Sequence, residues 1–355
     1  MKLEQLNQQT EQQKALSVVN AKNKLLTIAI PTYNRAELLD QQLAWLIQDI
    51  NGFEEECEIF VSDNCSTDNT QEVIQKWQKS SRGITFRTNI NLENLGVMPN
   101  IIHCLKSAQT KFIWVIGDDD HIQNQTISYI ISKLKKYDNL SLIFLNFSGR
   151  NKFTNEPVHP PKIVGNRWFD VDSEDSHIDG KAIFEYCFSK SVGAVIFLTA
   201  SIYRTDLVQS ALQSWENAAN NWISLAYLAG YCAANGRVVV TKNTYIECIV
   251  GMSYWQKEPK SALLMQYKHI SDVLLKLEKN GYSKQFCRWM ILKNFQEVNL
   301  RVFFGAFRRW PIFTIKTIVP FLTLVILSIF DVGLFSNSKL HHRAIGLEQK
   351  KGLIY

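Results

Sequence analysis

The sequence lacks the closely spaced cysteine pairs that structural zinc sites and disulfide-rich secreted domains use. Its seven cysteines are odd in number and scattered singly along 355 residues, with no Cys-x-x-Cys pair. They are Cys57, Cys65, Cys104, Cys187, Cys232, Cys248 and Cys287. This pattern is typical of a reducing compartment, and it predicts neither a disulfide framework nor a zinc site.

A large excess of charge of one sign is also missing. The formal net charge is only +6, so bulk charge gives no support to a nucleic-acid partner. The first 24 residues are rich in Gln, Asn and Lys, and they lack the apolar stretch of a secretory signal peptide. We therefore expect the main folded region to lie in the cytoplasm and to bind no nucleic acid.

Short apolar segments alternate with segments of helical periodicity over the first 150 residues. The expected strands are 25–30, 58–61, 85–88, 112–116 and 140–146, and the expected helices are 36–50, 69–79, 99–109 and 124–137. Strands that alternate with helices of this length indicate βαβ units. We therefore predict an α/β fold with a Rossmann-like, mostly parallel sheet and flanking helices.

The character of the sequence changes after residue 146. Residues 149–182 predict a long loop, and we expect a strand over 192–203, a helix over 222–234 and a strand over 237–240. From 261 onward the chain is expected to be helical, with a stop at Asn280–Gly281. The expected parts are a polar lead (1–24), a first half (25–150), a second half (151–260) and a helical C-terminal region (261–355).

The apolar strand expected over 112–116 runs into three consecutive carboxylates, Asp118, Asp119 and Asp120. The carboxyl ends of strands are where open α/β sheets bind ligands. Like charges this close raise one another's pKa unless a cation lies among them. Mg²⁺ and Mn²⁺ prefer oxygen ligands and typically join carboxylates to substrate phosphates. The triplet therefore predicts a metal and phosphate site, although a solvated acidic turn that caps the next helix gives the same pattern.

Two more loops follow the first two expected strands. Residues 30–35 read Ile-Pro-Thr-Tyr-Asn-Arg, and residues 61–68 read Val-Ser-Asp-Asn-Cys-Ser-Thr-Asp. Asp63 is placed to accept a hydrogen bond from a base, whereas Asp68 is expected to cap a helix. Either loop alone is a weak signal, but three such loops at consecutive strand ends converge on one crevice.

These motifs together resemble the inverting family 2 of the GT-A nucleotide-sugar glycosyltransferases. The matching segments are residues 30–35, 61–68, Asn-Leu-Glu-Asn-Leu-Gly-Val-Met-Pro-Asn at 91–100 and Gly-Asp-Asp-Asp at 117–120. The resemblance covers residues 25–150 and implies a donor site that cradles the nucleotide, bonds its base and holds a divalent metal, Mn²⁺ or Mg²⁺. It assigns nucleotide-sugar binding to Pro31, Thr32, Tyr33, Arg35, Asp63, Asn94, Asp118 and Asp119, and metal binding to Asp118 and Asp120.

An inverting transfer also needs a carboxylate that deprotonates the acceptor hydroxyl. In the family this base comes from the second half, where the present sequence has no clear Glu-Asp signature. Glu216 is our candidate, because it follows a strand-like segment and neighbours Trp215. Asp179 and Glu247 remain rivals, and Glu216 as a surface or capping carboxylate is an equally good interpretation.

The C-terminal region contains a strongly apolar segment, residues 312–335, whose only charges are Lys316 and Asp331. Its uncharged core, Ile318–Phe330, is thirteen residues long, which falls short of the roughly 20 residues that a spanning helix needs. Pro320 is expected to interrupt this segment. Basic residues flank both sides: Arg301, Arg308 and Arg309 before it, and Lys339, Arg343, Lys350 and Lys351 after it. This favours an interfacial segment on the cytoplasmic face of the membrane, while a buried helix and a true span stay open.

The sequence therefore predicts a metal-dependent glycosyltransferase that acts on a glycan or lipid-linked saccharide acceptor, by analogy with bacterial surface polysaccharide synthesis. A nucleotidyltransferase would carry a Gly-rich basic loop after its first strand, which this chain lacks. A non-catalytic nucleotide-sugar or polysaccharide-binding membrane protein is the alternative, since no base signature is evident. Release of nucleoside diphosphate would distinguish the two.

Overall fold

The computed structural model describes residues 24–81, 83–158, 167–171, 176–250, 259–297 and 300–335. The chain divides into two compact units, one up to residue 253 and one from residue 254 onward. Most of the expected polar lead lies outside the described residues, as do the basic residues that follow the apolar C-terminal segment.

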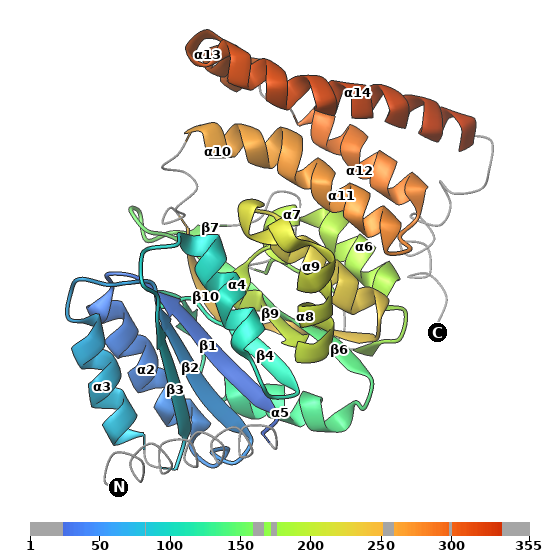
Figure 1. The fold of residues 1–355 in the computed structure, drawn as a ribbon. Helices are drawn as coiled ribbons and strands as arrows, with labels where there is room; N and C mark the ends of the chain where they lie inside the picture. The colour runs from blue at the N-terminus through green and yellow to red at the C-terminus, as the bar shows by residue number, and fades with distance from the viewer. Residues whose placement is uncertain are drawn as a thin grey trace, which may run out of the picture. The chain divides into compact units, whose positions relative to one another are not determined.

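The first unit alternates strands and helices (Figure 1). Its first half contains β1 (Leu26–Thr32), α2 (Ala36–Ile50), β2 (Cys57–Asp63), α3 (Thr70–Ser80), β3 (Thr85–Ile90), α4 (Val97–Ser107), β4 (Phe112–Val115), β5 (His121–Ile122), α5 (Thr126–Lys136) and β6 (Leu140–Asn151). Its second half contains β7 (Pro157–Val158), β8 (Ser176–His177), α6 (Gly180–Lys190), α7 (Val192–Val195), η1 (Leu198–Ala200), β9 (Ser201–Arg204), α8 (Thr205–Ser214), η2 (Glu216–Asn220), α9 (Ser224–Ala234) and β10 (Arg237–Val250).

A ten-stranded sheet with the order β3-β2-β1-β4-β9-β6-β10-β5 forms the centre of this unit, with β7 on β6 and β8 on β10. Strands β3, β2, β1 and β4 are parallel, and β6 is parallel to β10. β9 lies between β4 and β6 and is antiparallel to both. The predicted α/β class with flanking helices is confirmed, but the sheet is mixed rather than mostly parallel.

The strand predicted over 192–203 is wrong for most of its length. Helical turns α7 and η1 come first, and only Ser201–Arg204 forms a strand. Ser191 starts the first turn, because its side chain accepts a hydrogen bond of 3.1 Å from the N–H of Ala194. An N-cap of this kind outweighs the preference of the β-branched residues that follow it for a strand.

β1 continues through Pro31, where the sequence predicted that it would end. The N–H of Asn64 donates to the carbonyl of Thr32 at 2.9 Å, so Thr32 faces β2. Successive residues of a strand direct their hydrogen-bonding groups to opposite neighbours, so Pro31 faces the other side. Pairing with β4 has already ended there, at Ala29, so the missing N–H of Pro31 breaks no bond of the sheet.

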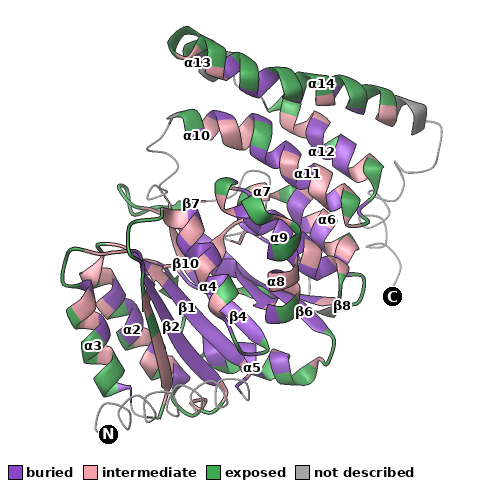
Figure 2. Cartoon of the chain, in the orientation of Figure 1, coloured by how far each residue is buried: buried purple, intermediate pink, exposed green. Residues whose placement is uncertain are grey.

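The central strands are buried on both faces (Figure 2). Helices α4, α8 and α9 pack on one face, and α2, α3 and α5 group on the other (Figure 1). All four residues of β4 are buried, as their apolar and β-branched content predicts. All seven residues of β2 are buried too, including the polar residues Glu58, Ser62 and Asp63. This double cover holds the strand ends that carry the motifs in fixed positions.

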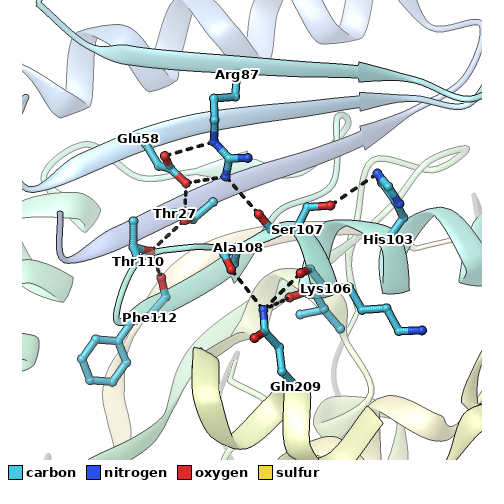
Figure 3. Close-up of polar contacts among 11 residues, drawn as sticks. Thr27, Glu58, Arg87, His103, Lys106, Ser107, Ala108, Thr110, Phe112 and Gln209 are labelled. Carbon is cyan, nitrogen blue, oxygen red and sulfur yellow. Dashed lines mark hydrogen bonds and ion pairs between the residues drawn. The ribbon is translucent and has the colours of Figure 1, made fainter. Parts of the chain in front are cut away.

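A buried ion pair ties the amino ends of three strands together (Figure 3). Glu58 is fully buried, and its Oε1 accepts from Arg87 Nη2 at 2.7 Å and from the hydroxyl of Thr27 at 2.6 Å. Arg87 Nη2 also donates to the carbonyl of Ser107 at the end of α4, at 3.1 Å. Thr110 shares a hydrogen bond with Thr27 at 2.7 Å, which places the entry into β4. Every charge in this cluster has a partner, as burial requires.

The second unit is helical. It contains α10 (Pro259–Leu263), a π-helical turn η4 (Leu264–His269), α11 (Ile270–Lys279), α12 (Lys284–Gln296), α13 (Leu300–Arg309) and α14 (Pro311–Phe335). The predicted stop after residue 279 is confirmed. Pro311–Val332 is long and apolar enough to cross a membrane by length and composition alone, and 33% of its most apolar window is buried.

α14 runs through Pro320, where the sequence predicted an interruption. Packing explains the difference, because Ile318 and Phe321 on either side of the proline are both buried and α14 lies against α12. The carboxylate of Asp331 is bound by Lys284 at 2.9 Å and by Arg288 at 3.0 Å, both on α12. One side of α14 is therefore anchored within its own unit.

Candidate functional site

The side chains predicted to bind a donor gather at the carboxyl ends of β1, β2 and β4. Thr32 lies opposite Asp63 in the pairing of β1 with β2. On the other side of β1, the N–H of Ile116 donates to the carbonyl of Ala29 at 2.9 Å, so the chain leaves β4 beside the end of β1. Tyr33 follows Thr32 directly in the chain, and it is half-buried. The three loops thus adjoin, as the sequence predicted.

Asp118 and Asp119 share one cationic partner. Arg35 Nη1 lies 2.7 Å from Asp118 Oδ1 and 2.8 Å from Asp119 Oδ2. The hydroxyl of Thr32 donates to Asp118 Oδ2 at 2.9 Å. Burial raises the pKa of Asp118, and the guanidinium of Arg35 opposes that shift. Oxygens of two carboxylates therefore converge on a single nitrogen.

Asp120 is held from the second half of the unit. The hydroxyl of Thr199 donates to Asp120 Oδ2 and accepts from the N–H of Gly117 at 2.9 Å. Trp114 Nε1 in turn donates to the carbonyl of Thr199 at 2.7 Å. Burial, with the nearby charge of Asp119, raises the pKa of Asp120 to about 7. Sequence reasoning missed Thr199, because it lies in a segment that read as a continuous strand and belongs to no motif.

Asp63 is fully buried, and its own turn binds its carboxylate. Oδ1 accepts from the N–H of Ser66 at 3.0 Å and from its hydroxyl at 2.5 Å, and Oδ2 accepts from Gln71 Nε2. These contacts fix the shape of the loop after β2. The predicted contact of Asp63 with a nucleotide base stays a prediction. For this contact to form, a carboxylate oxygen of Asp63 must lose one of these donors or accept from the base in addition to it.

The loops after β1 and β2 brace each other. Asn34 Oδ1 accepts from the N–H of Thr67 at 2.7 Å, and the N–H of Asn34 donates to Ser66 Oγ at 2.9 Å. Asp68 Oδ2 accepts from the N–H of Ala36 at 3.0 Å, so it caps the first turn of α2 from a distance. Asn34 has a φ of 51°, in the left-handed region that asparagine tolerates better than most residues.

A cluster of four amide side chains and one serine hydroxyl links the loop after β2 to the loop before α4. Its members are Ser62, Asn64, Asn91, Asn94 and Asn100. Asn64 Nδ2 donates to Asn94 Oδ1 at 2.8 Å, and the N–H of Gly96 donates to the same oxygen at 2.9 Å. Asn94, predicted to bind the donor, therefore orders its own loop; a contact with the donor stays a prediction.

The three candidate bases lie in different places. Asp179 caps α6, accepting from the N–H of Ala182 at 3.1 Å, and β8 just before it pairs with Val238 and Val239 near the start of β10. Glu247 lies eight residues further along β10, opposite His121. At about 3.3 Å per residue the two ends are roughly 20 Å apart even with the irregular stretch between them. This separation argues against Asp179 as a base near the acidic triplet.

Glu247 is beside the triplet but engaged. Arg150 donates to both of its oxygens, at 2.8 and 2.9 Å, and this pairing lowers the pKa of Glu247. Glu216 is exposed at the start of η2, which packs against α4. Since β9 is antiparallel to β4, α8 carries the chain back toward the carboxyl ends before η2 begins. Glu216 thus stays our candidate for the base, because it is exposed and lies toward the carboxyl ends of the strands, whereas the carboxylate of Glu247 is bound by Arg150.

The donor set fits a divalent ion that arrives with a substrate. Two carboxylates already converge on one cation position, and both offer the hard oxygen atoms that Mg²⁺ and Mn²⁺ prefer. Within the described ranges, no group of three or more His, Cys, Asp or Glu side chains is arranged as a complete metal site. The remaining ligands would therefore come from phosphate oxygens and water.

Comparison with known families supports this arrangement. Residues 27–191 match the model of glycosyl transferase family 2. The abequosyltransferase RfbV of Salmonella typhimurium is 27% identical over 186 residues, which are 50% of this chain and 52% of that protein. The GalNAc(5)-diNAcBac-PP-undecaprenol beta-1,3-glucosyltransferase of Campylobacter jejuni is 31% identical over 109 residues, 30% of this chain and 34% of that protein. The chain thus spans about half or less of the length of these curated relatives.

Solved structures show the same fold. TarS residues 1–349 of S. aureus align with a TM-score of 0.55 and 16% identity, covering 80% of this chain and 74% of that one. Its complex with UDP-GlcNAc aligns with a TM-score of 0.53 and 16% identity, over 87% and 80%. The mannosyltransferase PcManGT from Pyrobaculum calidifontis, with GDP-Man and Mn²⁺, gives 0.51 and 12%, over 87% and 86%. Residues 27–191, just under half of the chain, thus match glycosyltransferase family 2, and the first unit has the GT-A fold.

Proposed function

We propose that the chain is a nucleotide-sugar-dependent glycosyltransferase that transfers a sugar, with inversion, to a hydroxyl of a glycan or lipid-linked acceptor. The observation that carries this proposal is the convergence of Asp118 and Asp119 on one cation position beside the loops after β1 and β2. The printed names of two relatives, an abequosyltransferase and a glucosyltransferase with a PP-undecaprenol acceptor, support a role in bacterial surface glycan synthesis.

The nucleotide lies across the loops after β1 and β2 in this proposal. Pro31, Thr32 and Tyr33 line the nucleotide, and Asp63 accepts from the base. These loops are rigid because Asn34 and Asp68 cross-link them, so little conformational entropy is lost when the donor binds. Arg35 supplies positive charge next to the diphosphate.

A divalent ion, Mn²⁺ or Mg²⁺, bound at Asp118 would neutralise the charge that develops on the leaving diphosphate. Asp120 is the second ligand predicted from the sequence, and the geometry adds Asp119 as a candidate because it shares the cation position with Asp118. Thr199 orients Asp120 through its hydroxyl. The chain's own contribution is thus to hold three carboxylates, of which those of Asp118 and Asp120 are buried, in a preorganised turn.

Glu216 is the proposed general base. It would take the proton of the acceptor hydroxyl on the face of the sugar opposite the leaving group. Its exposure lets a large glycan acceptor approach. Glu247 is the rival, because its strand pairs with β5 directly after Asp120.

The second unit holds the enzyme on the cytoplasmic face of an anionic membrane. Apolar side chains on one side of α14 are exposed at alternating spacings of three and four residues: Ile312, Ile315, Val319, Leu322, Ile326 and Ile329. Phe330 is 67% exposed beside them, and Phe304 and Phe307 extend the apolar surface onto α13. Arg308, Arg309 and Lys316 are exposed next to this surface and match the negative charge of the lipid.

In this proposal α14 lies in the membrane plane and does not cross the bilayer. The opposite side of the helix is buried, with Phe321 packed edge-on against Tyr267 at a ring distance of 5.3 Å. Crossing would break that contact and would separate Asp331 from Lys284 and Arg288. A charged group in the bilayer without its partners costs about 2.5–3.5 kcal/mol or more.

A donor screen tests the transferase proposal. Purified full-length protein is incubated with UDP-, GDP-, CDP- and dTDP-sugars, with Mn²⁺ or Mg²⁺ and a lipid-linked or glycan acceptor, and nucleoside diphosphate release is measured. We expect release with one nucleotide class and a strong dependence on acceptor. Binding of a nucleotide-sugar without release under any condition would favour the non-catalytic binding protein instead.

A further inference from the structure

The guanidinium of Arg35 lies at a position where a metal ion or a phosphate of the donor would also bind. Arg35 is the residue that immediately precedes α2, and its side chain is 15% exposed. One nitrogen, Nη1, contacts Asp118 at 2.7 Å and Asp119 at 2.8 Å. Two carboxylates at such distances from a single atom leave no room for a second cation between them. The guanidinium is thus the counter-ion of the acidic turn.

Electrostatics explain why such a counter-ion is needed. Asp118 is only 6% exposed, and Asp119 and Asp120 follow it in the chain. Without a cation the three carboxylates would repel one another, and their protonation would weaken any metal site. Arginine fits this role, because its planar guanidinium stays charged and binds carboxylates or phosphates equally well in two-point contacts.

We propose that Arg35 is a displaceable counter-ion: a divalent metal takes its place between Asp118 and Asp119, and the released guanidinium binds the donor's diphosphate. The inference rests on the proposed function and adds a rule of coupling. When the metal binds alone, Arg35 loses its contacts with Asp118 and Asp119 and gains no others. When the metal binds with a diphosphate, the released guanidinium of Arg35 contacts the phosphates instead. Metal and nucleotide therefore bind together, and each raises the affinity for the other by the same factor.

The test measures binding rather than activity. Mn²⁺ binding to the full-length protein is followed by the EPR signal of free Mn²⁺, alone and with UDP or GDP. In the wild type we expect weak binding of Mn²⁺ alone, and binding at least about tenfold tighter with the nucleotide that fits. In Arg35→Gln we expect Mn²⁺ alone to bind about tenfold tighter than in the wild type, and the gain from nucleotide to be clearly smaller than in the wild type, because only the direct ligation of the metal by phosphate oxygens remains.

Two control variants make the result interpretable. Arg35→Lys keeps a cation near the carboxylates and should retain most of the coupling, and it is the second variant if Arg35→Gln has a lowered melting temperature. Lys76→Gln removes the exposed ion pair between Lys76 on α3 and Asp40 on α2, both of which are far from the triplet in the sequence. This variant should change neither the affinity for Mn²⁺ alone nor the affinity for Mn²⁺ with nucleotide.

The outcomes separate the two proposals. Nucleotide-enhanced Mn²⁺ binding in the wild type that persists unchanged in Arg35→Gln would overturn the displacement while leaving the metal-dependent site intact. Mn²⁺ that binds equally well with and without nucleotide in the wild type would overturn the coupling. Nucleotide binding in the absence of any Mn²⁺ binding would overturn both the displacement and the metal dependence of the proposed function.

Discussion

Thr199 and Asp120 are 79 residues apart in the sequence, yet the hydroxyl of Thr199 donates directly to the carboxylate of Asp120. The same hydroxyl accepts from the N–H of Gly117, so a single side chain ties both ends of the acidic turn to η1. The turn is therefore fixed by the second half of the sheet and not by its own residues alone. This contact can be tested without touching a carboxylate.

Thr199→Val should lower both stability and activity. The substitution keeps the shape but leaves buried polar groups of Asp120 and Gly117 without this partner, which typically costs about 1–3 kcal/mol of unfolding free energy. Loss of the hydrogen bond also raises the pKa of Asp120 further, so less of it is charged near pH 7. Urea unfolding and kcat measured between pH 6 and 8 check this, and activity should recover partly at high pH.

Thr205→Val is the matched control. The hydroxyl of Thr205 is buried and has no hydrogen-bond partner among the residues that the structure describes. Its removal should change the unfolding free energy by no more than about 0.5 kcal/mol. It should change kcat by no more than about twofold. Equal losses in both variants would mean that the Thr199 contact has no special role.

Removing the metal or one carboxylate should reduce transfer strongly. Asp120→Asn deletes one anionic oxygen at the proposed metal site, and loss of a preorganised electrostatic contact typically costs about 10²–10³-fold in rate. Excess EDTA should have a comparable effect on the wild type, reversed by Mn²⁺. Near-normal kcat for Asp120→Asn, together with activity in chelator, would contradict a metal-dependent reaction.

The general base is identified by comparing Glu216→Gln with Glu247→Gln. Loss of the true base should lower kcat by about 10²–10⁴-fold and remove the acid-side decline of its pH profile, with donor KM little changed. We expect this for Glu216. Glu247→Gln should instead lower stability, because Arg150 loses its partner. The reverse pattern in steady-state kinetics would assign the base to Glu247.

Glu185 on α6 should make the unfolding free energy depend on pH, independently of the candidate functional site. Burial, with a smaller effect of Asp179, raises the pKa of Glu185 from 4.5 to about 7. The folded state therefore binds a proton that the unfolded state has released, so this group's contribution to stability is complete below pH 4.5 and falls as pH rises to 7. After allowance for its partial exposure, the loss should be about 1 kcal/mol. Glu185→Gln should flatten this part of the curve in urea unfolding at several pH values; an unchanged slope would contradict the assignment.

The exposed side of α14 should control membrane binding. Leu322→Gln with Ile326→Gln removes apolar area worth roughly 25 cal/mol per Å² and should weaken flotation with anionic vesicles about tenfold or more. Arg308→Gln with Arg309→Gln should weaken it mainly at low salt. Ile178→Gln, at an apolar residue that is 78% exposed in the other unit, is the control and should have no effect. Protection of the tail from protease on one side only, with wild-type flotation in all variants, would favour a spanning helix.

Local sequence signals predicted the first half of the fold closely. Helix 36–50 has the predicted bounds, and Asp68 accepts from the N–H of Thr70 at the start of α3, because both features depend on residues that are close in the sequence. The acidic triplet was placed correctly at a strand end for the same reason. The hold of Thr199 on Asp120 and the bridging by Arg35 depend on which strands become neighbours. No local pattern shows that β9 inserts antiparallel beside β4, so these contacts could not be predicted.

Because β9 inserts between β4 and β6, the two halves of the sheet cannot be exchanged separately between related proteins. A fragment ending near residue 150 would leave β4 as an open edge strand, with the indole N–H of Trp114 deprived of the Thr199 carbonyl. Open apolar edges of this kind pair with other chains and aggregate. Exchange of the donor half between relatives would therefore have to carry residues 198–204 with it, although they are distant in the gene. Recombination along this chain should be tolerated after β9 and penalised between β4 and β9.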